Sequence, residues 1–317
     1  HIPVPNKLWS AMTMLGTASL DREVAGRTNT PVDAVLLPNL GFVGRLSAPY
    51  ALILHDLSFL IEPRWFSPKT QLWHRAVGAT QLIRGAARLF AVSETSARDA
   101  ERVLAIPRDR IETFHPGIPN LNSVTPIPSP ESPVPTPFIL AFGEPNPRKN
   151  VATAIAAVAK LREEPEFTDL HLIIVGPTPR VQFPVPSPPA SLREALRAGS
   201  QQNWITRLSH LSDPELTDLY GHASALLYPS WYEGFGLPLH EAARHGTPCL
   251  ASAHGALPET APRGTLFIPP AKPHLWAAAL RDVLRSPDLY QTTFDPADEQ
   301  PRVEGLLDWI RSMSAGV

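Results

Sequence analysis

The sequence has one cysteine, almost no net charge and no long apolar run, and each shortage excludes a class of protein. Cys249 stands alone, so neither an internal disulfide nor a multi-cysteine zinc site can form. A net charge of -2 offers no basic excess for binding along a phosphate backbone, so we do not expect nucleic acid as a partner. No apolar run approaches the roughly 18 residues of a membrane span, and the first residues lack the apolar core of a signal peptide. We expect a cytoplasmic protein with at most peripheral contact at the inner membrane face.

Length and proline content predict two domains. A chain of 317 residues exceeds the usual size of one domain, and its 43% apolar residues can fill two cores. Many of the 37 prolines gather between Pro116 and Pro137, where the loss of backbone donors predicts a stiff linker, and a second group between Pro177 and Pro189 predicts a surface loop. The predicted domains are residues 1–136 and 137–300, followed by a helix in 301–317 that packs back on the first domain.

Short apolar runs alternate with longer helical patterns along the chain. This alternation predicts an α/β fold with parallel sheets covered by helices on both faces. Ligands of such sheets bind beyond the carboxyl ends of the strands. The predicted strands are 51–54, 89–92, 138–142, 170–175, 225–228 and 248–251, and the predicted helices are 67–88, 95–104, 151–164, 213–222, 238–245, 271–285 and 302–313.

The stretch from Tyr228 to Ala242, YPSWYEGFGLPLHEA, carries the most chemical information. A predicted strand ends there, Gly234 and Gly236 permit positive φ and close backbone approach, and a helix follows whose first amides suit a phosphate. Glu233 and Glu241 could bracket one ligand, because a carboxylate can accept from both hydroxyls of a vicinal diol.

This stretch resembles the Glu-x7-Glu signature of retaining glycosyltransferases of family 4, which have the GT-B fold of two Rossmann-like domains facing across a cleft. The segment Phe142–Asn150, FGEPNPRKN, is similar to the family's Gly-x-x-x-x-x-Lys-Asn segment, and His55-Asp56 resembles the family's His-Asp turn. The resemblance implies transfer of a hexose from a nucleotide-diphosphate sugar to an acceptor hydroxyl, with retention and without a metal. It implies a carbohydrate or lipid-linked acceptor, as in polysaccharide biosynthesis.

The resemblance also assigns roles to single residues. Arg148 and Lys149 would neutralise the donor diphosphate, and fixed cations suit a leaving group that gains charge. Glu233 would orient the sugar, Glu241 the ribose, and His55 would face the donor from the first domain. The remaining donor-binding residues expected are Gly143, Glu144, Gly176, Gly234, Phe235, Gly236 and Leu237.

Other readings of the same residues stay open. Asp56 could accept from nearby backbone amides, Ser93 and Glu94 could cap a helix, and Cys249 could be a small core residue. The family usually begins with a strand, a glycine-rich loop and a helix, for which this sequence has no residues before His1. Either the fragment lacks that unit, or a partner chain supplies it, or activity is impaired. The alternative functions are a non-catalytic nucleotide-sugar-binding remnant or subunit, and a GT-B nucleotide-sugar epimerase. A dinucleotide-dependent oxidoreductase is disfavoured, because no Gly-x-Gly-x-x-Gly follows a strand.

Overall fold

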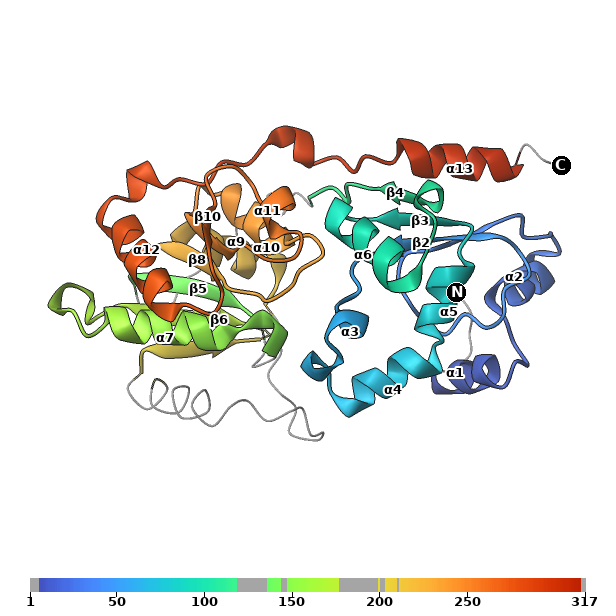
Figure 1. The fold of residues 1–317 in the computed structure, drawn as a ribbon, viewed down its shortest axis with the longest axis horizontal. Helices are drawn as coiled ribbons and strands as arrows, with labels where there is room; N and C mark the ends of the chain where they lie inside the picture. The colour runs from blue at the N-terminus through green and yellow to red at the C-terminus, as the bar shows by residue number, and fades with distance from the viewer. Residues whose placement is uncertain are drawn as a thin grey trace. The chain divides into compact units, whose positions relative to one another are not determined.

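The computed structural model describes residues 6–118, 136–143, 147–176, 199, 203–209 and 211–314 of the chain. These residues form two compact units (Figure 1). Unit 1 comprises His1–Pro63, Ser67–Pro116 and Pro301–Val317, and unit 2 comprises Arg64–Phe66 and Gly117–Gln300. Most of the predicted linker and the whole predicted loop between Pro177 and Pro189 lie outside the described residues.

Each unit is built on one parallel sheet, as the alternating sequence pattern predicted. The sheet of unit 1 has the order β1-β2-β3-β4, and that of unit 2 has the order β10-β9-β8-β5-β6-β7. The strands of unit 1 are β1 (Val35–Leu37), β2 (Tyr50–Leu54), β3 (Arg88–Ala91) and β4 (Ile111–Thr113). Those of unit 2 are β5 (Phe138–Phe142), β6 (His171–Val175), β7 (Ile205–Leu208), β8 (Ala225–Tyr228), β9 (Cys249–Ser252) and β10 (Leu266–Ile268).

Helices cover these sheets. The α-helices of unit 1 are α1 (Asn6–Met14), α2 (Leu20–Thr28), α3 (Ser58–Ile61), α4 (Pro68–Ala76), α5 (Ala79–Gly85), α6 (Glu94–Leu104) and α13 (Glu304–Ser314). Those of unit 2 are α7 (Val151–Leu161), α9 (Asp213–His222), α10 (Leu237–Ala243), α11 (Leu257–Thr260) and α12 (Pro273–Arg285). Short 3-10 turns are η1 (Pro63–Trp65), η2 (Arg108–Arg110), η4 (Pro147–Lys149), η5 (Pro165–Phe167), η6 (Pro287–Leu289) and η7 (Pro296–Asp298).

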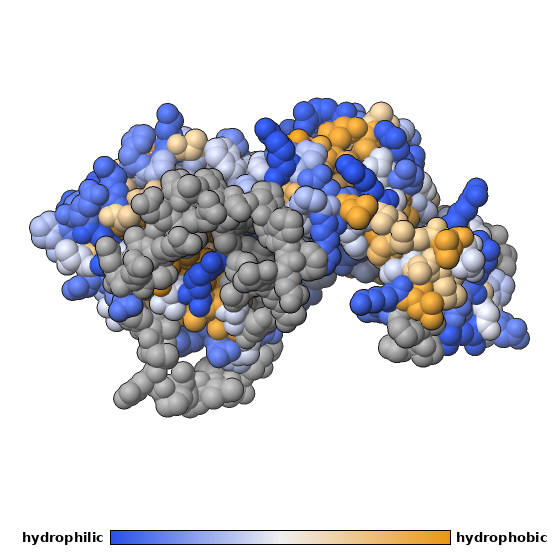
Figure 2. All heavy atoms as spheres, turned by 90° about the horizontal axis from the view of Figure 1, so that it is seen from below, coloured by the Kyte–Doolittle hydropathy of each residue, from blue (hydrophilic) through white to orange (hydrophobic). Residues whose placement is uncertain are grey.

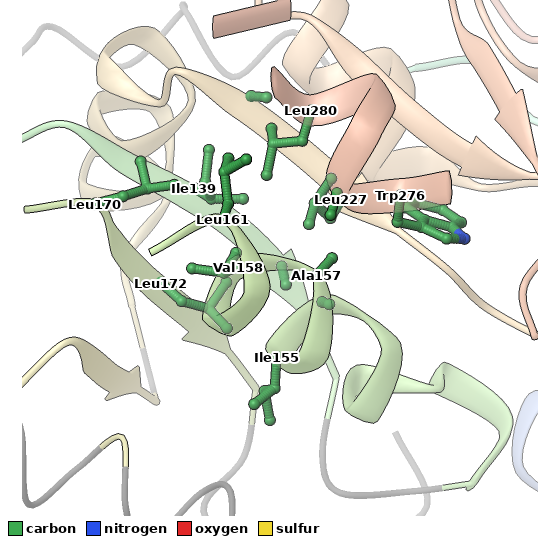
Figure 3. Close-up of a cluster of buried hydrophobic side chains, with 14 of the residues drawn as sticks. Ile139, Ile155, Ala157, Val158, Leu161, Leu170, Leu172, Leu227, Trp276 and Leu280 are labelled. Atoms are coloured by element: carbon green, nitrogen blue, oxygen red, sulfur yellow. The ribbon is translucent and has the colours of Figure 1, made fainter. Parts of the chain in front are cut away.

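Strand β5 shows why the central strands of unit 2 are apolar at every position. Successive side chains of a strand point to opposite faces of the sheet. Ile139 and Ala141 therefore join the cluster under α7 and α12, which includes Val158 and Trp276 (Figure 3). Phe138 and Leu140 join the cluster on the opposite face, under α9 and α10. Because both faces are buried, the strand reads as one continuous apolar run rather than an alternation.

The expected helix over 67–88 is wrong as a single element. It divides into α4 and α5 at Gly78, which adopts a φ of +66° and caps α5. Ser67 does cap α4, accepting from the backbone amide of Thr70. Four strands with only three or four residues each, β1, β4, β7 and β10, were not predicted, because such short runs carry little periodic signal.

The surface of unit 1 carries several large apolar side chains. Leu8 and Met14 of α1 and Leu72 of α4 are exposed, and Figure 2 shows hydrophobic residues among hydrophilic ones on this part of the molecule. Within the described residues, no helix has the length and hydropathy to cross a bilayer.

Candidate functional site

Arg148, Lys149 and Glu233 come together at the carboxyl end of the unit 2 sheet. Lys149 Nζ lies 2.6 Å from Glu233 Oε1, and Arg148 Nη1 lies 3.1 Å from Glu233 Oε2. Arg148 Nη1 also donates to the backbone oxygen of Tyr232 at 3.0 Å. Strands β5 and β8 are neighbours in the sheet, so the segments that follow them meet although some 85 residues separate them in sequence. Side-chain exposures of 18%, 21% and 9% show that the two cations keep a surface open to a ligand while the carboxylate does not.

Asn150 fixes the two cations against the following loop. It adopts a left-handed φ of +49° at the start of α7, and its amide nitrogen donates to the backbone oxygens of Pro229 and Pro270 at 3.0 Å each. The backbone amide of Trp231 donates to the Arg148 oxygen at 2.8 Å. Asparagine tolerates the left-handed region better than most residues, which explains this residue type directly after the Arg-Lys pair. Asn150 is a positioning residue that our sequence reasoning left out of the site.

Two glycines hold the backbone around Glu233. Gly236 has a φ of +100°, and a side chain there would lie 2.6 Å from Leu257 Cδ2. Gly255 has a φ of +61°, and a Cβ there would lie 2.8 Å from the Glu233 backbone nitrogen. The backbone amide of Ala256 donates to the Glu233 oxygen at 3.0 Å. The backbone at Gly255 and Ala256 therefore packs closely against the Glu233 backbone and fixes the position from which its side chain extends.

The electrostatics of the site favour an ionised Glu233. Burial by itself raises the pKa of this carboxyl, but the charges of Lys149 and Arg148 outweigh it and hold the pKa below its ordinary value. The hydroxyl oxygen of Tyr228, at the end of β8, accepts a hydrogen bond from Lys149 Nζ at 3.1 Å, and that ammonium also lies 5.1 Å from the tyrosine ring centroid. Two cations and one carboxylate leave a local charge of about +1, which suits a polyanionic ligand.

Glu241 lies on α10, one helix turn beyond the glycine-bearing loop. Its Oε2 accepts from the hydroxyl of Tyr220 at 2.6 Å. Burial raises the pKa of Glu241, and the Tyr220 hydrogen bond partly opposes that change. Burial also raises the pKa of Tyr228 well above its ordinary value, and the carboxylates of Glu233 and Glu241 both add to this. Both glutamates of the Glu-x7-Glu pair therefore act electrostatically on the buried Tyr228 hydroxyl.

The other predicted donor-binding residues differ in their location and burial. Gly143 follows β5 with a φ of +124°, and a Cβ there would lie 2.6 Å from Lys149 Cβ, so only glycine lets that lysine approach. Gly176 follows β6 and donates to the Leu208 oxygen at 3.0 Å. Gly236 adopts the positive φ that a glycine at this position permits. Phe235 is buried against the His240 ring, and Leu237 is 37% exposed. Glu144 lies outside the described residues.

His55 belongs to unit 1. It follows β2, is exposed, and its Nε2 lies 2.9 Å from the Pro38 oxygen. Asp56 accepts from the backbone amide of Ser58 at 2.8 Å, which agrees with the structural reading of that aspartate. Ser93 caps α6 by accepting from the Ser96 amide at 3.1 Å, so the cap reading holds for it as well. Cys249 is buried on β9, as a small core residue should be.

Among the residues that the structure describes, no three or more histidine, cysteine, aspartate or glutamate side chains are grouped to hold a metal ion. The absence of a metal requirement stays a prediction.

Comparisons with solved structures identify the fold. A sucrose-phosphate synthase from Thermosynechococcus elongatus superposes with a TM-score of 0.69 at 20% identity, covering 99% of this chain and 81% of that one. HepE from Anabaena, solved in complex with UDP and glucose, superposes with a TM-score of 0.68 at 19% identity, covering 100% of this chain and 87% of that one. The predicted α/β fold of GT-B type is confirmed.

Comparisons of sequence identify the family. The chain is 28% identical over 212 residues to the O-antigen chain mannosyltransferase B of Escherichia coli, covering 65% of this chain and 53% of that protein. It spans about half the length of the curated relatives that it matches. The sequence model of the family described as glycosyl transferases group 1 matches residues 127–296, a range that holds Arg148, Lys149, Glu233 and Glu241. The chain therefore belongs to the group 1 glycosyl transferases.

Proposed function

We propose that this chain is a retaining glycosyltransferase that moves a hexose from a nucleotide-diphosphate sugar to an acceptor hydroxyl without a metal ion. The observation that carries the proposal is the convergence of Arg148 and Lys149 on Glu233 at the carboxyl ends of β5 and β8. Two partly exposed cations on a rigid frame suit the diphosphate of a donor, since charge-assisted contacts to phosphate are the stronger kind of hydrogen bond.

The proposed reaction places its developing negative charge on the leaving diphosphate. The bond between the anomeric carbon and the donor phosphate oxygen breaks while the acceptor oxygen bonds to the same carbon on the same face. The acceptor proton passes to the leaving phosphate oxygen, so no side-chain nucleophile is needed. Arg148 and Lys149 stabilise the negative charge that the diphosphate gains, and this preorganised stabilisation is the protein's main contribution. Glu233 orients the sugar hydroxyls, and Glu241 accepts from the ribose.

The donor is a hexose on UDP, GDP or ADP. A mannosyltransferase among the relatives supports mannose, and the neighbour solved with UDP and glucose supports glucose on a uridine nucleotide. The acceptor is a carbohydrate or a lipid-linked carbohydrate, supported by the O-antigen assignment of that relative. Sugars that differ by one hydroxyl need only one changed contact for discrimination, so turnover must decide among them.

The test separates binding from chemistry. Calorimetric titration with UDP, GDP and ADP should give binding of one of them, and Lys149→Met should weaken that binding by roughly 10- to 100-fold, the effect of losing one charge-assisted contact. Lys160→Met, at an exposed position of α7, is the matched control and should leave affinity unchanged. Glu233→Gln should retain the nucleotide but lose sugar transfer. If none of the three nucleotides binds, the proposal is wrong.

Turnover distinguishes the alternatives. Incubation with the matching nucleotide sugar and a panel of carbohydrate acceptors should give a glycoside with the donor's anomeric configuration. An epimerase would change the sugar of the donor when no acceptor is present. A non-catalytic binding subunit would bind the nucleotide sugar and give neither product. An inverted glycoside would contradict the retaining mechanism while leaving the transferase assignment intact.

A further inference from the structure

Tyr220 makes a contact that the catalytic scheme does not use. Its side chain is fully buried on α9, and its hydroxyl donates to Glu241 Oε2 at 2.6 Å. A buried tyrosine hydroxyl needs a partner, but nothing requires that partner to be a carboxylate on a neighbouring helix. The pair therefore couples a wholly buried residue to one of the two glutamates of the candidate site.

Three further contacts prevent Tyr220 from moving. Its ring stacks on Phe142 with a centroid distance of 5.7 Å and an interplanar angle of 24°. The ring also stacks with His245, with a centroid distance of 6.2 Å and an interplanar angle of 11°. The hydroxyl of Thr247 donates to the Tyr220 backbone oxygen at 2.6 Å. Phe142 directly precedes Gly143, so this stack connects the end of β5 with α9 and with the end of α10.

Tyr220 donates the hydrogen bond that holds Glu241 Oε2, and the charge of Arg244 also acts on this carboxyl. Within the described part of the chain, no lysine, arginine or histidine forms an ion pair with it, and Tyr220 is the donor to its Oε2. Glu233 differs, since two cations hold both of its oxygens. Glu241 therefore has one carboxylate oxygen fixed by the Tyr220 hydroxyl, and the residue itself stays partly exposed, so the carboxylate can accept from a further donor. A carboxylate in this state can accept from one or both hydroxyls of a ribose.

We propose that Tyr220 is a positioning residue that fixes the Glu241 carboxylate for the ribose diol and so makes the site selective for ribonucleoside over 2′-deoxyribonucleoside diphosphates. The inference rests on the proposed function. The inference adds Tyr220, which is not part of the Glu-x7-Glu signature. It also identifies the ribose as the part of the nucleotide that the site selects. A fixed carboxylate rejects a ligand that lacks the hydroxyl because its lone pairs would then be left unpaired near the protein interior.

The experiment measures the ratio of Kd values for the 2′-deoxy and ribo forms of UDP, GDP and ADP. The wild-type chain should bind one ribonucleotide about tenfold more tightly than its 2′-deoxy form, a typical effect for one hydrogen bond to a charged group. Tyr220→Phe keeps the ring stack and removes only the hydroxyl, so the ratio should fall toward 1 while the affinity for the 2′-deoxy form changes less than about twofold.

Two further variants separate positioning from folding. Glu241→Gln should lower the ratio to the same extent, and adding Tyr220→Phe to it should have no further effect, because both changes remove one interaction. Tyr50→Phe, which removes a hydroxyl that donates to the Leu82 oxygen in unit 1, should leave the ratio unchanged. Sugar transfer at saturating donor should fall less than the nucleotide affinity in Tyr220→Phe.

The outcomes distinguish this inference from the proposed function. If the wild-type chain binds a nucleotide but does not discriminate against the 2′-deoxy form, the inference fails and the transferase proposal stands. The inference also fails if Tyr220→Phe keeps the wild-type ratio, or if its effect adds to that of Glu241→Gln. If no nucleotide binds to the wild-type chain, both the proposed function and this inference fail. Should Tyr220→Phe not fold, the wild-type ratio and Glu241→Gln still decide.

Discussion

Replacing Glu233 by glutamine tests the electrostatic account of the site through stability as well as activity. The change keeps the size of the side chain but removes the negative charge between Lys149 at 2.6 Å and Arg148 at 3.1 Å. Breaking a fully buried ion pair costs about 3–5 kcal/mol. Here water reaches both cations and the amide oxygen still accepts, so we expect unfolding to become easier by about 2–3 kcal/mol. For a unit of this size that corresponds to a Tm about 4–12 °C lower.

The Tm difference between wild type and Glu233→Gln should depend on pH, because the pKa of Glu233 differs between the folded and unfolded states. The folded-state pKa of Glu233 lies below its ordinary value of 4.5, so the carboxylate stabilises the fold fully above that value and loses its contribution as the pH falls through the lower folded-state pKa. The difference in Tm between wild type and Glu233→Gln should therefore be constant from about pH 8 to about pH 6 and should shrink below about pH 4.5.

Thermal unfolding, followed by circular dichroism or calorimetry across this pH range, measures both quantities. Glu164→Gln is the matched control: Glu164 also pairs with two arginines of unit 2, Arg281 and Arg285, but at the surface. Surface pairs contribute little, so the control should shift the Tm by no more than about a degree. A Glu233→Gln protein with the wild-type Tm at neutral pH, or a Tm difference that grows toward acid, would refute the reasoning.

Two further predictions concern the frame of the site, and a third concerns the core of unit 2. Gly143→Ala places a Cβ 2.6 Å from Lys149 Cβ at a φ of +124°, so nucleotide affinity measured by calorimetry should fall about tenfold, whereas Gly26→Ala, with open space around it, should change nothing. Asn150→Asp puts a carboxylate oxygen opposite two backbone oxygens and should lower the unfolding free energy by about 3 kcal/mol; a loss under about 1 kcal/mol would contradict the role given to the amide. Burial raises the pKa of the Cys249 thiol to about 12, so Ellman's reagent at pH 8 should label it only after denaturation, and rapid labelling of the native protein would contradict its burial.

Much of the fold could be predicted because its strands are apolar on both faces. The structure gives β5 over Phe138–Phe142, α9 over Asp213–His222 and β8 over Ala225–Tyr228, with the bounds that apolar runs and caps indicate. Prediction failed where the local signal was short or ambiguous. The helical pattern continues through Gly78, and only the packing of α5 against the sheet shows that the chain turns there. Three-residue strands such as β1 form because they pair with a neighbouring strand, here β2. That pairing leaves no pattern in the local sequence.

The sequence by itself determined the residue types of the site: an Arg-Lys-Asn run after one strand and a Glu-x7-Glu pair after another. It also determined that these residues lie at strand ends, because parallel sheets place every carboxyl end on one edge. The tertiary structure alone decided that β5 and β8 are neighbours, and so that Glu233 contacts both cations. It alone showed that Asn150 anchors the cations and that Tyr220 holds Glu241. Strand order and the packing of α9 against α10 depend on how the apolar side chains of the whole unit are buried together. They therefore cannot be predicted from any short segment of the sequence.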